Sequence, residues 1–308
     1  MQATLYHRYG GPEVLETAEI PKPQPKANEL LVRVHAASVS VGSVIMRSGK
    51  HPDSAFFSFM IKIIGGWPKP RKKVLGYEFS GVVEAVGGKV TAYKIGDEVY
   101  GTTTGLKQGA FADYVCIPEK WSQGVVAHKP AVLSFEEAAA LPVGGMTSLH
   151  LWKPAGLAAG KKVLVYGAGG SVGSAAVQIA KAAGAEVTAV CSTSKMALAK
   201  NWGAQHVIDY TQTPLAQFPA HFDCIFDAVG KLPAKQLKSL LAPGGKFSSI
   251  RSLTSEKTEY LQQLQMLIAA GQFRPHIDKV FPRSQMREAH AYVDSGKKAG
   301  NVVVRMRN

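Results

Sequence analysis

Glycines at a regular spacing follow an apolar stretch in the middle of the chain. Residues 163–173 read VLVYGAGGSVG, with Gly167, Gly170 and Gly173 three residues apart. The first part is typical of a buried strand and the last part of a helix start. A helix N-terminus offers unpaired N–H groups and a partial positive charge, and glycine lets a phosphate approach the backbone. The spacing predicts a turn that binds pyrophosphate, with a tight turn without a ligand as the alternative.

The end of the next expected strand indicates which dinucleotide such a turn would serve. A free ribose 2′-hydroxyl is usually held by Asp or Glu at this place. Residues 190–195 read VCSTSK and contain no carboxylate. Ser192 and Lys195 suit a 2′-phosphate instead, so the sequence favours NADPH over NADH. Alternatively, Ser192 caps the next helix and Lys195 lies on its solvated face, and both interpretations can hold at once.

Strands and helices alternate around these residues, which is typical of a parallel sheet covered on both faces. The expected strands are 162–166, 186–191, 206–209, 223–227 and 245–250, and the helices between them include 172–183 and 195–202.

The residues before about 128 have a different pattern, with short apolar stretches between Gly and Pro turns. This pattern predicts a small barrel or sandwich. Ser134 and Glu137 form a capping box at a helix start. The apolar strand at 300–306 is expected to return to the first domain, and residues 286–291 are expected to form a short surface helix. The expected domains are 1–128, 129–265 and 266–308.

Composition excludes several classes of protein. Of 308 residues, 46% are hydrophobic and 19% charged, which excludes a disordered chain. Three cysteines without a CxxC exclude a disulfide scaffold and a cysteine-rich zinc lobe. They favour a reducing compartment, and we expect the cytoplasm. The net charge of +14 attracts polyanions. Because the basic residues are scattered and no recognition motif accompanies them, nucleic acid is not an expected partner.

One segment, residues 56–73, is both apolar and basic. It joins Phe56, Phe57, Phe59 and Trp67 to a cluster of lysines and an arginine at 69–73. Such a stretch can lie at an anionic membrane surface. It can equally form the core or the wall of a hydrophobic pocket, which is the preferred interpretation.

Ordered motifs along nearly the whole chain resemble a known family. They include GGPEVL at 10–15, AASVS at 36–40, LGYEFSGVV at 75–83, GDEVYG at 96–101 and GAFADY at 109–114. The chain resembles zinc-independent members of the medium-chain dehydrogenase/reductase superfamily, in the quinone oxidoreductase and enone (2-alkenal) reductase branch. The resemblance implies an α/β protein with a GroES-like β-barrel catalytic domain, a Rossmann domain with a doubly wound parallel sheet, and an active cleft between them.

Departures from the zinc-dependent relatives bear on the chemistry. Those relatives have Cys where this chain has Ser40, and His where it has Tyr77. A hydroxyl and a phenol are poor Zn²⁺ ligands, so no metal is expected. Quinones and enones accept hydride without a metal because their π-systems are extended. Quinone-type relatives often have Asn at the position of Ser40 and Asp at that of Ser43. Asn301 replaces a usual Lys, which removes a charged contact to phosphate or ribose.

The resemblance also implies roles for individual residues. Ser40 and Tyr77 are candidates to hydrogen-bond the substrate oxygen, with Tyr77 as a packed barrel residue the alternative. Members of the family are often dimers joined through an edge of the Rossmann sheet, so a homodimer is expected. The implied cofactor contacts are Gly170, Ser171, Val172 and Gly173 at the pyrophosphate, Tyr210 near the adenosine, Thr147 near the carboxamide, Ala228 and Val229 near the ribose, and Phe247, Ser248 and Ser249 around the nicotinamide.

Two functions of different classes remain open at this point. The leading hypothesis is an NADPH-dependent reductase that transfers hydride to a quinone or an α,β-unsaturated carbonyl compound without a metal. The alternative is an NADPH-binding protein of the same fold with little turnover, acting as a regulatory or peripheral membrane module. The altered residues Ser40 and Ser43 motivate this alternative.

Overall fold

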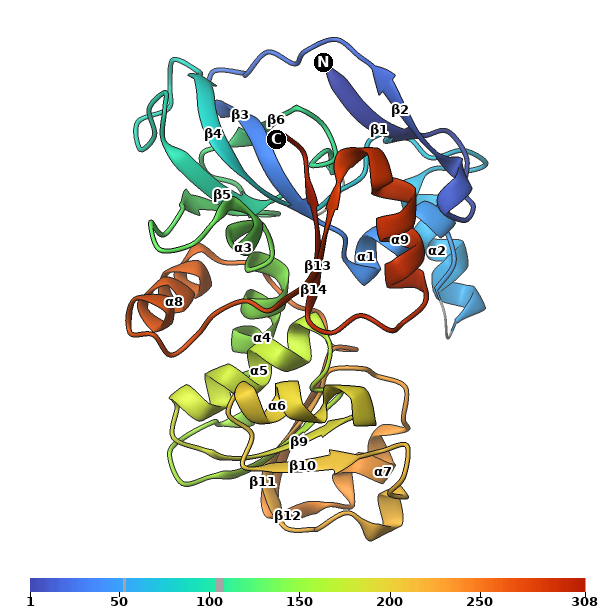
Figure 1. Ribbon diagram of the computed structural model, residues 1–308, viewed down its shortest axis with the longest axis vertical. Coiled ribbons are helices and arrows are strands. Elements are labelled where there is room, and N and C mark those ends of the chain that lie inside the picture. Colours follow the sequence, from blue (N-terminus) through green and yellow to red (C-terminus); the bar gives the residue numbers. More distant parts are fainter. Residues whose placement is uncertain (52–53, 104–107, 308) are drawn as a thin grey trace. The chain divides into compact units, whose positions relative to one another are not determined.

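The computed structural model describes residues 1–51, 54–103 and 108–307, and the chain divides into two compact units (Figure 1). Unit 1 comprises Met1–Pro142 and Ile277–Asn308, and unit 2 comprises Val143–His276. The boundaries between the units lie after Pro142 and His276, later in the chain than the expected boundaries after 128 and 265. The first is later because helix α3 (Phe135–Ala139) packs on the strands of unit 1, where the Ser80 hydroxyl donates to its Phe135 carbonyl.

Unit 1 contains a seven-stranded, mainly antiparallel sheet and a separate hairpin of β1 and β2. Its strands are β1 (Gln2–Tyr6), β2 (Leu15–Glu19), β3 (Glu29–Ser38), β4 (Glu78–Val86), β5 (Glu98–Thr102), β6 (Tyr114–Pro118), β7 (Val126–His128), β13 (Ile277–Pro282) and β14 (Asn301–Arg305). The order is β13-β14-β3-β4-β5-β7, and β6 also pairs with β3. The expected β-rich first part is therefore observed, and the C-terminal strand β14 lies antiparallel to β3 within this unit.

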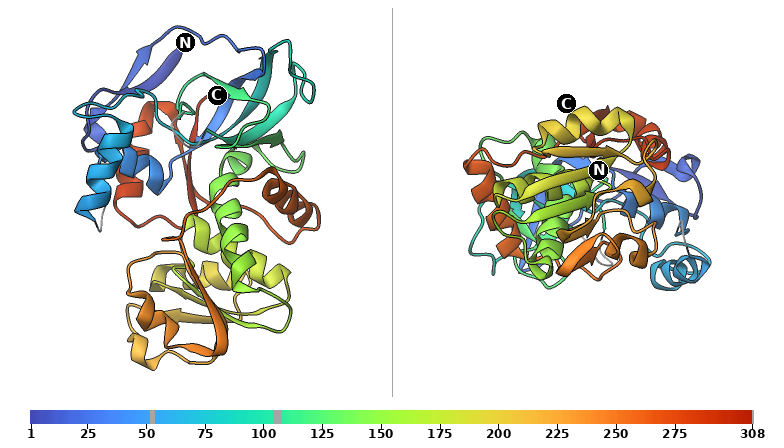
Figure 2. Two further views of the ribbon diagram at one scale, coloured as in Figure 1. Left: turned by 180° about the vertical axis from the view of Figure 1, so that it is seen from behind. Right: turned by 90° about the horizontal axis from the view of Figure 1, so that it is seen from below.

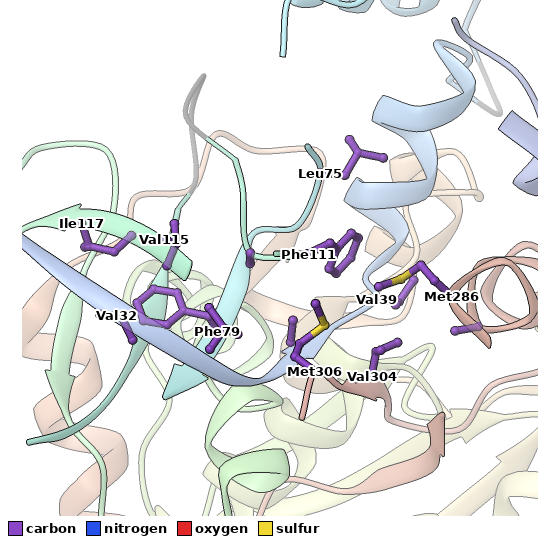
Figure 3. Close-up of a cluster of buried hydrophobic side chains, with 14 of the residues drawn as sticks. Val32, Val39, Leu75, Phe79, Phe111, Val115, Ile117, Met286, Val304 and Met306 are labelled. Atoms are coloured by element: carbon purple, nitrogen blue, oxygen red, sulfur yellow. The ribbon is translucent and has the colours of Figure 1, made fainter. Parts of the chain in front are cut away.

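The core of unit 1 lies between this sheet and its helices. Val32 on β3 and Phe79 on β4 are fully buried in the same apolar cluster (Figure 3). Met286 from helix α9 (Met286–Asp294) joins that cluster. The expected helix at 286–291 is observed at the surface, with Arg287, Glu288 and Ala291 exposed, and its other side supplies core residues.

Three further segments of unit 1 are helical. Helix α1 (Val41–Ser48) is joined to α9 by an ion pair of 2.6 Å between the buried Arg47 and Asp294. The predicted capping box of α3 is confirmed, with both Ser134–Glu137 hydrogen bonds present. Helix α2 (Ala55–Gly65) contains no buried residue, so the expectation that this segment is core is wrong. Two short 3₁₀ helices complete the unit, η1 (Pro12–Val14) and η4 (Arg283–Gln285).

Unit 2 is a five-stranded parallel sheet with helices on its faces, as predicted (Figure 2). Its strands are β8 (Lys162–Tyr166), β9 (Glu186–Cys191), β10 (His206–Asp209), β11 (Phe222–Asp227) and β12 (Leu241–Ser249). Its helices are α4 (Pro142–Ala155), α5 (Ser171–Ala182), α6 (Met196–Asn201), α7 (Ala234–Lys238) and α8 (Thr258–Ala269), with 3₁₀ helices η2 (Thr193–Lys195) and η3 (Leu215–Gln217). The strand order β10-β9-β8-β11-β12 is that of a doubly wound fold.

The strand order of unit 2 decides where a ligand can bind. The sheet reverses direction of winding at the first strand, β8, which lies between β9 and β11. Ligands of such sheets bind outside the carboxyl ends of the strands at that point. Because the strands are parallel and in register, the residues after Tyr166, Cys191 and Asp227 emerge at one edge.

Candidate functional site

The predicted glycine turn connects β8 to α5 at this edge. Gly167 has φ of 84°, a backbone conformation that favours glycine. The N–H groups of Gly167 and Ala168 donate to the carbonyl of Val190 on β9, at 3.0 and 2.9 Å. The N–H of Gly167 is therefore already bonded within the protein, and Gly167 contributes to the turn through its backbone conformation. Helix α5 begins after Gly170, so the N–H groups of its first turn are the donors that face a ligand.

Gly173 allows α5 to begin this close to the turn. A Cβ on Gly173 would lie 2.1 Å from the carbonyl oxygen of Gly167 and 2.7 Å from the Cα of Ala168. Both contacts are with backbone, which cannot move aside as a flexible side chain can. This is the third glycine of a dinucleotide turn acting in close packing of helix and strand.

Helix α4 supports the first turn of α5 from the other side. The Ser148 hydroxyl lies 2.8 Å from the carbonyls of both Gly144 and Val172, and its proton can serve either. A Cβ on Gly144 would lie 2.5 Å from Oγ of Ser171, so the two helices approach closely. Thr147, the residue expected near the carboxamide, lies on the same helix α4 and is partly buried.

The residues after β9 lie against the glycine turn. A Cβ on Gly169 would lie 2.3 Å from Cδ of Lys195, so the lysine chain covers that glycine. Ser192 is the N-cap of η2 by position, but its side chain makes no capping hydrogen bond. Its hydroxyl lies 3.4 Å from that of Ser194. Ser192 therefore does not cap a helix through its side chain, whereas the role of Lys195 toward a 2′-phosphate stays a prediction.

A carboxylate that the sequence analysis missed lies beside these residues. Asp209 ends β10 and is paired in register with Cys191 on β9. It accepts hydrogen bonds from the Thr193 hydroxyl and from N and Oγ1 of Thr211, the latter two at 2.9 and 2.7 Å. The bonds from Thr193 and then Thr211 hold the pKa of Asp209 below its ordinary value. Asp209 reaches these residues because β10 pairs with β9, and the local sequence does not show that pairing.

A second carboxylate organises the ends of β11 and β12. Oδ1 of Asp227 accepts from the N–H groups of Val229 and Gly230 at 3.0 and 2.8 Å. Its Oδ2 accepts from the Ser249 hydroxyl at 2.9 Å. Ala228 is held to β8, with its N–H donating to the carbonyl of Tyr166 at 2.8 Å. Asp227 thus positions two of the residues predicted to contact the cofactor, Val229 and Ser249.

The remaining predicted contacts of unit 2 are found at the same edge. Tyr210 follows β10 and its side chain is exposed, while Phe247 is partly buried near the end of β12. Ser248 is buried, and its hydroxyl has no hydrogen-bond partner among the described residues. A buried hydroxyl without a partner is costly, and a polar ligand would satisfy it. With the helix start and Lys195, this hydroxyl fits a dinucleotide.

The candidate catalytic residues lie in unit 1. Ser40 is the N-cap of α1, with its hydroxyl 3.2 Å from the N–H of Ser43 and 3.3 Å from the Ser43 hydroxyl. A Cβ on Gly42 would lie 3.5 Å from Oγ of Ser40 and 3.6 Å from Cε2 of Tyr77, so the two side chains are neighbours. Burial, and then the nearby Tyr6, raises the pKa of Tyr77 above its ordinary value. Its phenol is protonated at neutral pH, as that of an ordinary tyrosine is, and burial makes it still harder to ionise.

One further expected contact can be placed in the structure. Asn301, expected in place of a charged cofactor contact, begins β14 in unit 1 and is buried. Within residues 1–51, 54–103 and 108–307, no three His, Cys, Asp or Glu side chains gather where they could hold a metal ion.

Comparison with known proteins matches both units. Residues 26–130 match the family described as alcohol dehydrogenase GroES-like domain, and residues 171–272 and 248–304 match families described as zinc-binding dehydrogenase. The chain is 32% identical to a 2-methylene-furan-3-one reductase of Solanum lycopersicum, over 99% of this chain and 79% of that protein. It is also 32% identical to a chloroplastic NADPH-dependent alkenal/one oxidoreductase of Arabidopsis thaliana, with the same coverage.

A solved structure agrees with these relatives. The quinone oxidoreductase of Coxiella burnetii superimposes with a TM-score of 0.84 at 27% identity, over 100% of this chain and 99% of that one. The expected combination of a GroES-like domain and a Rossmann sheet is confirmed. The chain belongs to the medium-chain dehydrogenase/reductase superfamily, among the relatives of quinone oxidoreductases and alkenal/enone reductases.

Proposed function

We propose that the protein is an NADPH-dependent reductase that transfers hydride to a quinone or an α,β-unsaturated carbonyl compound without a metal. One observation carries the proposal: the chain of Lys195 covers Gly169 in the glycine turn. A pyrophosphate-binding turn and a cation for a further phosphate are thereby parts of one site. The relatives named as reductases of a 2-methylene-furan-3-one and of alkenals and alkenones support the reaction class.

Each end of the cofactor has residues suited to it. The first turn of α5, from Gly170 to Gly173, offers N–H groups to the pyrophosphate. Lys195 and Ser192 offer a charge and a hydroxyl to the 2′-phosphate. The buried Ser248 hydroxyl suits the polar part of the nicotinamide. When bound, NADPH supplies the hydride, and the protein positions and shields it.

Unit 1 supplies a proton donor in place of a Lewis acid. Tyr77 carries its phenolic proton at neutral pH, as an ordinary tyrosine does, and burial raises its pKa further. That proton can be donated in a hydrogen bond to a carbonyl or quinone oxygen, which becomes more negative as hydride arrives. Ser40 lies beside it, and its hydroxyl is oriented by the start of α1. Neither side chain suits Zn²⁺, and a conjugated acceptor needs no metal to take up hydride.

The reaction is tested by mixing the protein with NADPH and adding a 2-alkenal or an ortho-quinone. We expect the absorbance of the reduced nicotinamide to fall, and the rate to be unchanged after dialysis against a metal chelator. Tight NADPH binding without consumption by either substrate class would support the alternative of a binding protein with little turnover. The three relatives described above are named for redox activity, which does not favour that alternative.

The cellular location and the oligomeric state of the protein remain predictions. Cys116, Cys191 and Cys224 form no disulfide, which suits the reducing cytoplasm that we propose. Among the described residues, no helix is long and apolar enough to cross a bilayer. The homodimer expected from the resemblance would use an edge of the unit 2 sheet, where β12 is an outer strand.

A further inference from the structure

Helix α2 presents large apolar side chains to solvent. Phe56 is 67% exposed, Phe59 55% and Ile63 44%, and Phe57 and Ile64 are exposed as well. No residue of the helix is buried. Soluble monomers rarely expose large contiguous apolar patches, and a patch of this kind marks a site that binds another molecule.

In a globular domain the apolar side of a helix ordinarily faces the core, whereas in α2 the apolar side faces solvent. At 100° per residue, Phe56, Phe59 and Ile63 form one stripe, and Ser58, Lys62 and Gly65 lie on the other side. That other side contacts unit 1: a Cβ on Gly65 would lie 3.0 Å from Oη of Tyr9. The apolar stripe therefore faces outward while the small and polar side is attached.

Specific hydrogen bonds keep α2 in this orientation. The Ser54 hydroxyl accepts from the N–H of Phe57 at 3.2 Å and caps the helix. The N–H of His51 donates to the Ser58 hydroxyl at 2.8 Å. At the other end, the Tyr9 hydroxyl donates to the carbonyl of Gly66 at 2.8 Å. The exposed stripe is thus held on an ordered helix.

Positive charge continues directly from the apolar stripe. Residues 54–77 include five Lys or Arg and no Asp or Glu. After the helix, Trp67 is 63% exposed, and four exposed basic residues follow. These four, called the basic cluster below, are Lys69, Arg71, Lys72 and Lys73.

The combination of stripe, tryptophan and basic cluster favours an anionic lipid surface as the occupant. Phe and Ile side chains suit the acyl boundary, Trp suits the headgroup level and lysines suit anionic headgroups. A second copy of this face would bring two basic clusters together and be repelled. We propose that α2 anchors the protein reversibly to bilayers that contain anionic lipid. This anchoring rests on α2, Trp67 and the basic cluster, and it does not depend on the proposed reaction.

Co-sedimentation of the full chain with vesicles tests the anchor. Vesicles of phosphatidylcholine alone are compared with vesicles that also contain phosphatidylglycerol, at low and at high salt and without NADPH. We expect binding to the anionic vesicles at low salt, with weaker binding at high salt and to the neutral vesicles. Fluorescence of the exposed Trp67 should shift to the blue on binding, and Trp67→Phe should remove the shift.

Two double variants separate the apolar and basic contributions. Phe56→Ser/Phe59→Ser should lower the partition coefficient by about tenfold or more, because two half-exposed rings no longer enter the bilayer. Its matched control is Ile95→Ser/Val132→Ser, which removes two other exposed apolar side chains of unit 1 and should leave partitioning unchanged. Since all four side chains are exposed, thermal unfolding should stay the same in both variants.

The basic pair is tested in the same way. Lys72→Gln/Lys73→Gln should lower the partition coefficient about fivefold for each lysine at low salt. Its control is Lys89→Gln/Lys94→Gln, two exposed lysines between β4 and β5, which should leave partitioning unchanged.

Four results would overturn the anchor. The first is absence of sedimentation with anionic vesicles at low salt, and the second is equal binding to neutral vesicles. The third is undiminished binding of Phe56→Ser/Phe59→Ser. The fourth is a protein that does not bind vesicles but forms a concentration-dependent oligomer, which Phe56→Ser/Phe59→Ser abolishes. Helix α2 would then join two protein surfaces.

Discussion

Lys195 lies over Gly169, so closely that a Cβ on the glycine would come within 2.3 Å of Cδ of the lysine. The two residues are separated along the chain by α5 and β9, and the parallel sheet brings them together. The backbone turn that suits a pyrophosphate and the cation that suits a 2′-phosphate are therefore adjacent parts of one surface. We expect a preference for NADPH over NADH to follow from this contact.

Lys195→Ala should reduce that preference. We expect affinity for NADPH to fall roughly 10- to 100-fold, the contribution of a hydrogen bond to a charged group, and affinity for NADH to change little. Titration calorimetry with each coenzyme measures both values. Lys200→Ala, an exposed lysine on α6, is the matched control and should alter neither. Equal losses for both coenzymes would contradict the assignment of Lys195.

Asp227→Ala should loosen the ends of β11 and β12. The N–H groups of Val229 and Gly230 and the Ser249 hydroxyl would lose their acceptor. We expect unit 2 to lose on the order of 3 kcal/mol of unfolding free energy, and NADPH to bind more weakly. Denaturant titration and calorimetry measure the two effects.

Two further variants refine the test of Asp227. Asp227→Asn keeps an oxygen for the two N–H groups, so its effect should be smaller than that of Asp227→Ala. Asp223→Asn changes the other end of the same strand, where Asp223 accepts from the N–H of Lys162 at 2.9 Å. It should leave cofactor affinity unchanged, and a loss as large as that of Asp227→Ala would refute the local role.

Tyr77→Phe should slow reduction of the substrate without weakening the binding of the cofactor. If the phenol donates to the substrate oxygen, its removal should lower kcat on the order of 100-fold at unchanged affinity for NADPH. Steady-state rates with an enone and NADPH titrations separate the two effects. Tyr93→Phe removes another phenol of unit 1, which donates to the carbonyl of Val126 at 2.9 Å, and should leave kcat unchanged. A wild-type rate for Tyr77→Phe would make Tyr77 a packing residue.

His290 should make the stability of the protein depend on pH. It is fully buried on α9, in edge-on contact with Phe111, and neither ring nitrogen has a hydrogen-bond partner among the described residues. Burial, and then the charge of Arg47, lowers the pKa of His290 to about 3. The unfolded chain therefore binds a proton below its ordinary pKa of 6.5 that the folded chain does not bind.

The direction of the effect follows from this difference. The contribution is fully stabilising above pH 6.5 and is lost as pH falls toward the folded pKa. Between pH 6.5 and about 5, the free energy of unfolding should drop by about 2 kcal/mol more in the wild type than in His290→Leu. Urea titrations at several pH values measure the difference. Parallel pH profiles for the two proteins would mean that His290 is protonated when folded.

The elements of unit 2 could be predicted from sequence because their signals are local. The strands at 162–166, 186–191 and 206–209 were predicted with the bounds that are observed, since each is a short apolar stretch between turn residues. The glycine turn was predictable for the same reason. Gly167 needs a positive φ and Gly173 needs the absence of a Cβ, and both needs appear as residue types at fixed spacing.

The tertiary structure alone decided which residues meet. Asp209 reaches Thr193 only because β10 pairs with β9, and Asp227 reaches Ser249 only because β12 pairs with β11. The segment 56–73 was interpreted as core or pocket wall, but α2 has no buried residue, which excludes the core. Helix α9 lies at the surface as expected, and its inner side supplies core residues that the sequence did not indicate. Periodicity fixes which side of a helix is apolar. What covers that side depends on contacts with segments far away in the chain, and those exist only once the chain has folded.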